Sequence, residues 1–245
     1  MVCSALAACG PGDGDARADE ATWSGRELPI ELEKPHFTFT DVEGRPYDFR
    51  RETEGFVTLL FFGYTNCPDV CPIHMANIAA VLRDLPTESA RSIKVVFVTT
   101  DPERDTPERL REWLGAIHPA FVGLRGPLHE VHAAEGSLML PASVIETGGH
   151  GSGEQPSGDY FVGHASSVVA FGANGLARLM YPFGTRQEDW ARDLPRLVRE
   201  AGETGGGASG AGARGRDTGS AAGTESAASG APAGGPHPAA GHGGG

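Results

Sequence analysis

The stretch "FVTLLFFGYTNCPDVCP", from Phe56 to Pro72, joins an apolar run to a closely spaced pair of cysteines. The run from Val57 to Phe62 is continuous and contains β-branched and aromatic residues, which favours a strand buried on both faces. Cys67 and Cys71 follow it, four positions apart and each followed by a proline. The chain has only four cysteines, so two of them in one short loop point to a function for this loop.

A second buried strand is expected at 93–100, where "IKVVFVTT" has the same continuous apolar character. Between the two runs, apolar residues recur at helical spacing until Pro86 ends the pattern. These residues are Met75, Ile78, Ala79, Leu82 and Leu85. Strand, helix and strand in this order form a βαβ unit, whose two strands lie parallel.

The remaining elements extend this unit. A second helix is expected to begin at Thr106 and Pro107, because threonine caps helices and proline fits their first position. The segments "HFTFTDVEGRPYDF" and "SSVVAFGANGLARLMYPF" predict hairpins. The segment "QEDWARDLPRLVREA" predicts a closing helix, with a break or kink at Pro195. This order is typical of an α/β, thioredoxin-like fold with a central mixed sheet flanked by helices and an N-terminal hairpin extension.

The chain divides into three parts. Residues 1–26 contain a signal-like start and a polar, Gly-rich linker, and residues 27–201 hold the predicted folded domain. Residues 202–245 are rich in Gly, Ala and Ser, and no large apolar residue follows Val198. Such a segment cannot bury enough surface to offset its ordering entropy, so we expect a disordered tail.

The start of the chain resembles a bacterial lipoprotein signal, because Leu6-Ala7-Ala8 precedes Cys9 and a flexible polar segment follows. In that pattern Cys9 becomes the lipidated N-terminus. A complete signal has a basic start and an apolar stretch of about 7–15 residues, whereas only eight residues precede Cys9 and none is Lys or Arg. The alternative is an unstructured N-terminus. Membrane attachment is therefore expected through a lipid on Cys9 or through an anchor missing from this sequence.

Charge and hydropathy exclude several classes of function. The formal net charge is −12, which makes duplex nucleic acid and anionic lipid surfaces poor partners for the whole chain. No apolar run in the sequence is long enough to span a membrane.

The position of the cysteine pair suggests its chemistry. In open α/β sheets, sites form beyond the carboxyl ends of the strands, which is where Cys67 and Cys71 lie. If Pro72 takes the first helical position, Cys71 is the cap, where free N–H groups and the helix dipole favour a thiolate. Two thiolates suit Cu(I), and the same pair can close into a disulfide. A copper or redox role is favoured over an inert disulfide, whose small loop gives little entropic gain, and over half of a zinc site.

Four motifs in order resemble the Sco/SenC proteins, which are copper-binding, thioredoxin-like assembly factors of cytochrome c oxidase. "FFGYTNCPDVCP" is similar to their cysteine loop, and "TTDPERDTPERL" to their second signature. "YFVGHASSVVAFGANG" resembles the segment that carries the histidine of the family, and "FTFTDVEGRPY" its opening hairpin. Together the matches run from Glu31 to Arg199 and cover almost the whole predicted domain.

The resemblance implies a copper site made by Cys67, Cys71 and His164. It also places an acidic residue between the cysteines, at Asp69. It gives Asp101 and Asp105, in the second signature, a structural or loop-orienting role.

The sequence departs from the family pattern around the histidine. The residue before it is often Asp and the residue after it is often Ser or Thr, but Gly163 and Ala165 stand here. Both changes remove side chains that could hydrogen-bond near His164. The segment "ETGGHGSGEQPSGD" (146–159) is longer and richer in Gly than usual, and its His150 is a candidate extra ligand.

Three functional hypotheses follow. The first is a metallochaperone that carries Cu(I) or Cu(II) to a copper-site subunit of cytochrome c oxidase or to another copper chaperone. The second is a thiol–disulfide oxidoreductase that keeps the cysteines of a partner reduced. The third is a peroxiredoxin-like enzyme, whose motif is missing. His164 separates the first two, because only copper binding gains from a third ligand. All this chemistry is expected outside the cytoplasm, at the membrane of the cell envelope.

Overall fold

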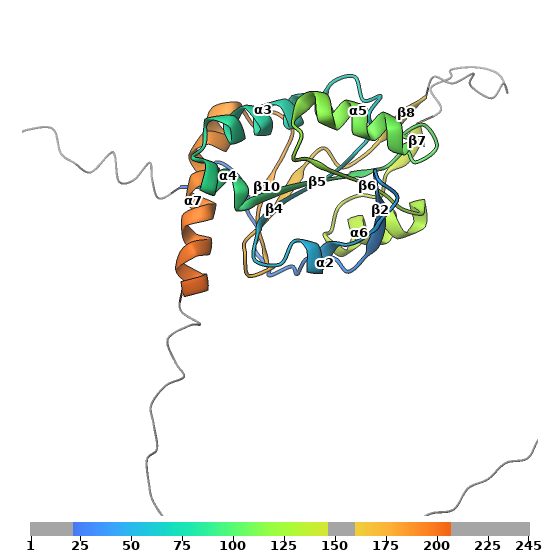
Figure 1. The fold of residues 1–245 in the computed structure, drawn as a ribbon. Coiled ribbons are helices and arrows are strands. Elements are labelled where there is room, and N and C mark those ends of the chain that lie inside the picture. The colour runs from blue at the N-terminus through green and yellow to red at the C-terminus, as the bar shows by residue number, and fades with distance from the viewer. Residues whose placement is uncertain (1–21, 147–159, 207–245) are drawn as a thin grey trace, which may run out of the picture. The chain divides into compact units, whose positions relative to one another are not determined.

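The computed structural model describes residues 22–146 and 160–206, with side chains as far as Glu203 (Figure 1). The main sheet contains β1 (Arg26–Glu27), β2 (Thr38–Asp41), β3 (Pro46–Asp48), β4 (Val57–Gly63), β5 (Ile93–Thr99), β6 (Val122–Arg125), β9 (Val168–Phe171) and β10 (Ala177–Tyr181). A two-stranded sheet pairs β7 (Val144–Glu146) with β8 (Phe161–Gly163). The helices are α2 (Phe49–Glu52), α3 (Val70–Asp84), α4 (Thr87–Arg91), α5 (Pro107–Ile117), α6 (Leu128–Ser137) and α7 (Gln187–Gly206).

The predicted βαβ unit forms the centre of the main sheet. Strands β4 and β5 pair in parallel, with Val57 opposite Ile93, and α3 lies in the crossover between them. The strand order β1-β10-β9-β4-β5-β6-β2-β3 adds β6 in parallel and β9 antiparallel, so the sheet is mixed as predicted. All seven residues of β4 are buried, which agrees with a strand covered on both faces.

Both predicted hairpins are present and extend the sheet in antiparallel pairs. Strands β2 and β3 flank a turn that contains Gly44, and β9 and β10 flank a turn that contains Gly175. The φ angles of these glycines are 80° and 81°, in the left-handed region that glycine adopts without a steric penalty. The sequence signals at both turns therefore predicted the local chain reversal correctly.

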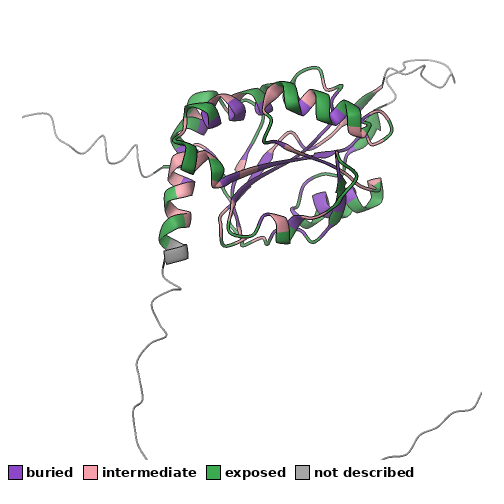
Figure 2. Cartoon of the chain, in the orientation of Figure 1, coloured by how far each residue is buried: buried purple, intermediate pink, exposed green. Residues whose placement is uncertain are grey.

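Helices cover both faces of the sheet (Figure 1, Figure 2). Because side chains alternate along a strand, Leu59 and Phe61 of β4 point into one core, while Leu60 and Phe62 point into the other. Helices α3, α5 and α7 complete the first core, and α2 and α6 complete the second. The cysteine loop leaves β4 on the side of the first core.

The ordered packing extends beyond the predicted domain at both ends. Trp23, which lies in the segment predicted as a linker, is only 8% exposed because its indole packs in the core and against the guanidinium of Arg196 at 3.8 Å. The backbone N–H groups of Ser24 and Gly25 donate to the carboxylate of Asp193. Helix α7 continues past Pro195, where we expected a break or kink, and ends at Gly206, inside the predicted tail. Within the described ranges, none of the helices has the length and apolar character needed to cross a bilayer.

Candidate metal centre

The cysteine loop runs from the end of β4 to the start of α3. Helix α3 begins at Val70, with Asp69 at its N-cap position and no side-chain capping bond. Our expectation that Cys71 caps the helix was therefore wrong, since Cys71 and Pro72 both lie in the first helical turn. A proline is tolerated there because the first turn has no intrahelical partner for its missing N–H.

Gly63 allows the helix to approach the end of β4 closely. A Cβ added at this position would lie 2.6 Å from Cys71 Sγ and 3.0 Å from the ring of Phe97. Any side chain here would therefore displace the sulfur or the ring. The glycine of the "FFGYT" segment is required by the position of Cys71, which is fully buried.

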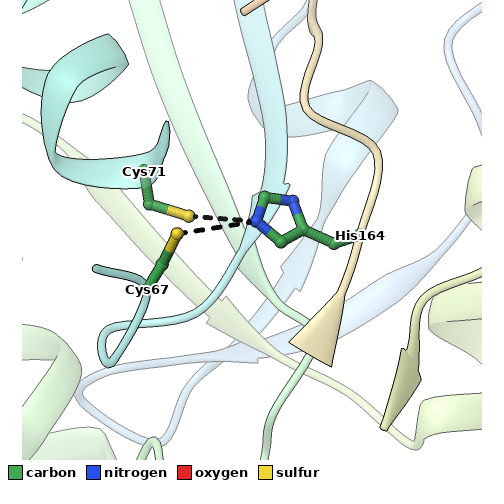
Figure 3. A group of neighbouring side chains, drawn as sticks. All are labelled: Cys67, Cys71 and His164. Atoms are coloured by element: carbon green, nitrogen blue, oxygen red, sulfur yellow. Dashed lines mark hydrogen bonds between the residues drawn. The ribbon is translucent and has the colours of Figure 1, made fainter. Parts of the chain in front are cut away.

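The structure brings Cys67, Cys71 and His164 together, although His164 is distant in sequence (Figure 3). His164 follows β8, and its Nε2 lies 3.4 Å from Cys71 Sγ and 3.8 Å from Cys67 Sγ. The three ligand atoms lie within 4.8 Å of one another. In the described part of the chain, this is the single group of three or more His, Cys, Asp or Glu residues with such a spacing.

Backbone and aromatic contacts orient the imidazole of His164. Its Nδ1 lies 3.0 Å from the carbonyl oxygen of Ala165, so a proton on Nδ1 leaves the Nε2 lone pair directed at the sulfurs. The rings of Phe61 and Tyr64 contact the imidazole edge to face, with centroids 5.8 Å and 5.6 Å away. The carbonyl oxygen of Ala165 thus takes the place of the side-chain hydrogen-bond partners that Gly163 and Ala165 cannot supply.

Gly163 has a close neighbour of its own. A Cβ added there would lie 2.6 Å from Oε1 of Glu146, which reaches across from β7. The larger acidic residue often found at this position of the family therefore does not fit here without movement of Glu146.

The pKa values of the two thiols shift in opposite directions. The pKa of Cys67 lies far below its ordinary value, first because the Cys71 thiol donates a hydrogen bond to the Cys67 thiolate, and further because of the contact with His164. Burial raises the pKa of Cys71, and the nearby Cys67 thiolate raises it further. The sequence had favoured Cys71 as the thiolate. That expectation was wrong because burial of Cys71 outweighs the benefit of the helix N-terminus.

His74 supports the site from within α3. Its side chain is only 1% exposed and contacts Phe61 and Trp190 edge to face. Its Nε2 lies 3.2 Å from the carbonyl oxygen of Ser166, two residues after His164. His74 therefore holds the segment that carries the metal-facing histidine. In the sequence, the one indication of this role is the position of His74, one helical turn after Cys71 on the same face of α3.

Asp105 holds the cysteine loop in place through hydrogen bonds. Its buried carboxylate accepts hydrogen bonds from the backbone N–H of Thr65 at 3.0 Å, from Thr65 Oγ1 at 2.5 Å and from Thr99 Oγ1 at 2.6 Å. Asp101 binds the side chain of Arg104 and accepts a hydrogen bond from the Tyr160 hydroxyl at 2.7 Å. Both residues therefore have the loop-orienting role expected for the second signature.

Other predicted residues are placed differently or lie outside the described residues. Asp69 is exposed and does not join the metal-facing group. His150 and Cys9 fall in segments that the structure does not describe, as does most of the predicted tail. Their proposed roles remain predictions.

Comparisons with known proteins agree with this arrangement. The SCO1/SenC family profile matches residues 27–199. A relative from Stutzerimonas stutzeri is 31% identical over 173 residues, which are 70% of this chain and 79% of that protein. The mitochondrial protein SCO2 of Saccharomyces cerevisiae is 30% identical over 129 residues, which are 53% of this chain but only 40% of the yeast protein.

Two solved structures share the fold. Apo Sco1 from Thermus thermophilus is 28% identical with a TM-score of 0.58, over 75% of this chain and 97% of that chain. The copper-bound ScoI of Bradyrhizobium japonicum is 29% identical with a TM-score of 0.56, over 67% of this chain and 99% of that chain. These matches confirm the predicted thioredoxin-like α/β fold. Because the family profile spans most of the sequence and both structures follow the same fold, the chain belongs to the SCO1/SenC family.

Proposed function

We propose that this protein is a copper metallochaperone and that its cargo ion is bound by Cys67, Cys71 and His164. The observation that carries the proposal is the convergence of two thiols and one imidazole nitrogen within 4.8 Å. Thiolates prefer Cu(I), and imidazole suits copper in either oxidation state. The copper-bound ScoI structure, which shares this fold, supports the choice of metal.

The surroundings of the three groups fit an ion that must enter and leave. Cys67 and His164 are half-buried, so an ion can reach them, while Cys71 lies at the buried end of the group. Cys67 already favours its thiolate, and binding of a soft cation releases the remaining proton of Cys71. The two sulfurs bind Cu(I) strongly and the nitrogen of His164 completes its site, whereas Cu(II) depends most on that nitrogen.

A thiol–disulfide oxidoreductase is the second candidate, and the hydrogen bond between the two cysteines favours it. A thiolate beside a thiol is the resting arrangement of a reducing pair. Cys67 would attack a disulfide of the partner and Cys71 would resolve the mixed disulfide. The partner then leaves with two thiols, and Cys67 and Cys71 remain as a disulfide. The protein is an enzyme only under this second candidate.

We further propose where and with what the protein acts. The recipient is a copper-site subunit of cytochrome c oxidase or another copper chaperone, as membership in the SCO1/SenC family suggests. Nucleic acid is not a partner, because the chain carries a net charge of −12. Attachment to the outer face of the plasma membrane through a lipid on Cys9 would keep the protein near that recipient.

The substitution His164→Ala separates the two candidates, since it removes one ligand and leaves the dithiol intact. Under the metallochaperone proposal, the variant binds Cu(II) much more weakly and cells that carry it lose oxidase activity. Thiol titration still finds both cysteines. His129→Ala is the matched control, because this histidine is exposed on α6 outside the metal-facing group. Normal oxidase activity in cells whose variant no longer binds copper would favour the reductase instead.

A further inference from the structure

A cleft of about 460 Å³ lies directly beside Cys67. Arg104 lines it from the segment before α5 and Arg109 from the first turn of α5, while Tyr160 and Phe161 line it from the start of β8. A molecule that approaches Cys67 through this cleft therefore meets two guanidinium groups. This local positive charge contrasts with the net charge of −12 of the whole chain.

Among the residues that the structure describes, no acidic group lies close enough to neutralise the charge of Arg109. Its Nε donates to Thr65 Oγ1 at 3.3 Å, and its Nη2 lies 3.5 Å from Asn66 Oδ1, so both of its partners are neutral. Across residues 22–146 and 160–203, no carboxylate oxygen lies within 4.0 Å of its guanidinium nitrogens. Thr65 is itself held by Asp105, so the exposed guanidinium has a fixed direction beside the cysteine loop.

Arg104 has a different role in the same cleft. It forms an ion pair with Asp101, and its guanidinium stacks on the ring of Tyr160 at 3.5 Å. One of its nitrogens donates to the Tyr160 carbonyl oxygen at 3.0 Å. These contacts balance its charge and fix the start of β8. Arg109 is therefore the group in the cleft that is best placed to attract an anion.

Phe161 adds an apolar surface. Its side chain is 58% exposed, although it lies in β8 only three residues before His164. Large exposed aromatic side chains are typical of contact surfaces. The cleft thus combines the guanidinium of Arg109 with the exposed ring of Phe161. This combination suits a ligand in which an acidic side chain has an apolar neighbour.

We infer that this cleft recognises an acidic segment of the partner protein, in which a carboxylate lies close to the partner's reacting cysteine. Arg109 binds the carboxylate while the partner's sulfur meets Cys67. Guanidinium and carboxylate groups pair well in a two-point geometry, and opposite charges raise the rate of encounter. The inference rests on the proposed function, since it names the chemistry of the partner that exchanges copper or electrons at this site.

The test uses the reduced, copper-free protein and two small disulfides as probes. Dithiobis(nitrobenzoate) carries carboxylates, whereas dithiodipyridine is neutral. The Cys67 thiolate attacks the S–S bond of the probe and releases one aromatic thiolate, leaving a mixed disulfide. Cys71 then attacks Cys67 in that mixed disulfide, loses its proton to solvent and releases the second aromatic group. Absorbance of the released groups gives the rate with each probe.

The measured quantity is the rate with the anionic probe divided by the rate with the neutral probe. Taking this ratio cancels changes in the reactivity of Cys67 that affect both probes alike. We expect Arg109→Glu to lower the ratio by at least about threefold at low ionic strength, because one charge near the reacting sulfur is reversed. The difference should vanish in 1 M salt, where the screening length is about 3 Å.

Arg83→Glu is the matched control, because it makes the same change of charge at the other end of α3. Its ratio should equal that of the wild type. An unchanged ratio in Arg109→Glu, or an equal fall in Arg83→Glu, would overturn the inference. If Arg109→Glu does not fold, Arg109→Gln is measured instead, and its rate ratio should fall in the same direction by a smaller amount. Both Arg109 variants should keep their copper stoichiometry, so the result is independent of the His164→Ala test.

Discussion

Replacing Asp105 by asparagine tests how the fold holds the cysteine loop. Both oxygens of the buried carboxylate accept hydrogen bonds, from two groups of Thr65 and from the hydroxyl of Thr99. Asparagine has nearly the same shape but turns one acceptor into an NH₂ donor, which then faces another donor. At least one buried donor therefore loses its acceptor, whatever the orientation of the amide.

The size of the effect follows from these contacts. A hydrogen bond to a charged group contributes about 1.5–3 kcal/mol, and a buried polar group left without a partner costs about 1–3 kcal/mol. The hydroxyl hydrogens can rotate and recover part of this loss, so we expect the free energy of unfolding to fall by about 2–4 kcal/mol. Denaturant titration measures this change. The affinity for Cu(I) should also fall, because Thr65 lies two residues before Cys67.

The control for this experiment is Asp84→Asn, which makes the same chemical change at an exposed position near the end of α3. Its stability should stay within about 0.5 kcal/mol of the wild type. A loss of less than about 0.5 kcal/mol in Asp105→Asn would show that this carboxylate does not hold the loop.

Three other predictions concern the surroundings of the site and the pH dependence of stability. Gly63→Ala should destabilise the fold by about 1–3 kcal/mol and weaken Cu(I) binding in competition assays, because the new methyl group overlaps Cys71 Sγ. Replacing His74 by phenylalanine should cost about 1–3 kcal/mol in thermal unfolding, since the Ser166 carbonyl loses its partner, while copper stoichiometry is retained. Burial lowers the pKa of Lys34 to about 8 from 10.5, so the unfolded chain binds more protons between these values. The wild type should therefore gain stability relative to Lys34→Met as the pH rises from 8 to 10.5; a constant difference across this range would contradict the shift.

The sequence predicted the elements that local patterns specify. The continuous apolar runs at 57–62 and 93–100 could be read directly as buried strands, and Thr106 caps α5 as expected by accepting a hydrogen bond from the N–H of Arg109. The position of His164 followed only from the family resemblance, because no local pattern brings a distant residue to the cysteine loop. The fold supplies that contact through the neighbouring strands β4 and β9.

The features that could not be predicted from the sequence depend on burial by other segments of the chain. Trp23 stands in a polar stretch, and only the packing of α7 reveals that it belongs to the core. His74 has a helical position that a surface residue could equally have, and it is buried because Trp190 and Phe61 cover it. The ionisation of the cysteines depends on the same effect, since the burial of Cys71 makes Cys67 the thiolate.

The copper site can be tested directly by X-ray absorption spectroscopy of the Cu(I)-loaded protein, with metal analysis of the same sample. We expect one copper ion per chain, bound by two sulfur atoms and one imidazole nitrogen. In His164→Ala, the nitrogen contribution should disappear and the two sulfurs should remain. A copper spectrum that is identical in the wild type and in His164→Ala, or copper retained when Cys67 and Cys71 are both replaced by alanine, would contradict the proposed site.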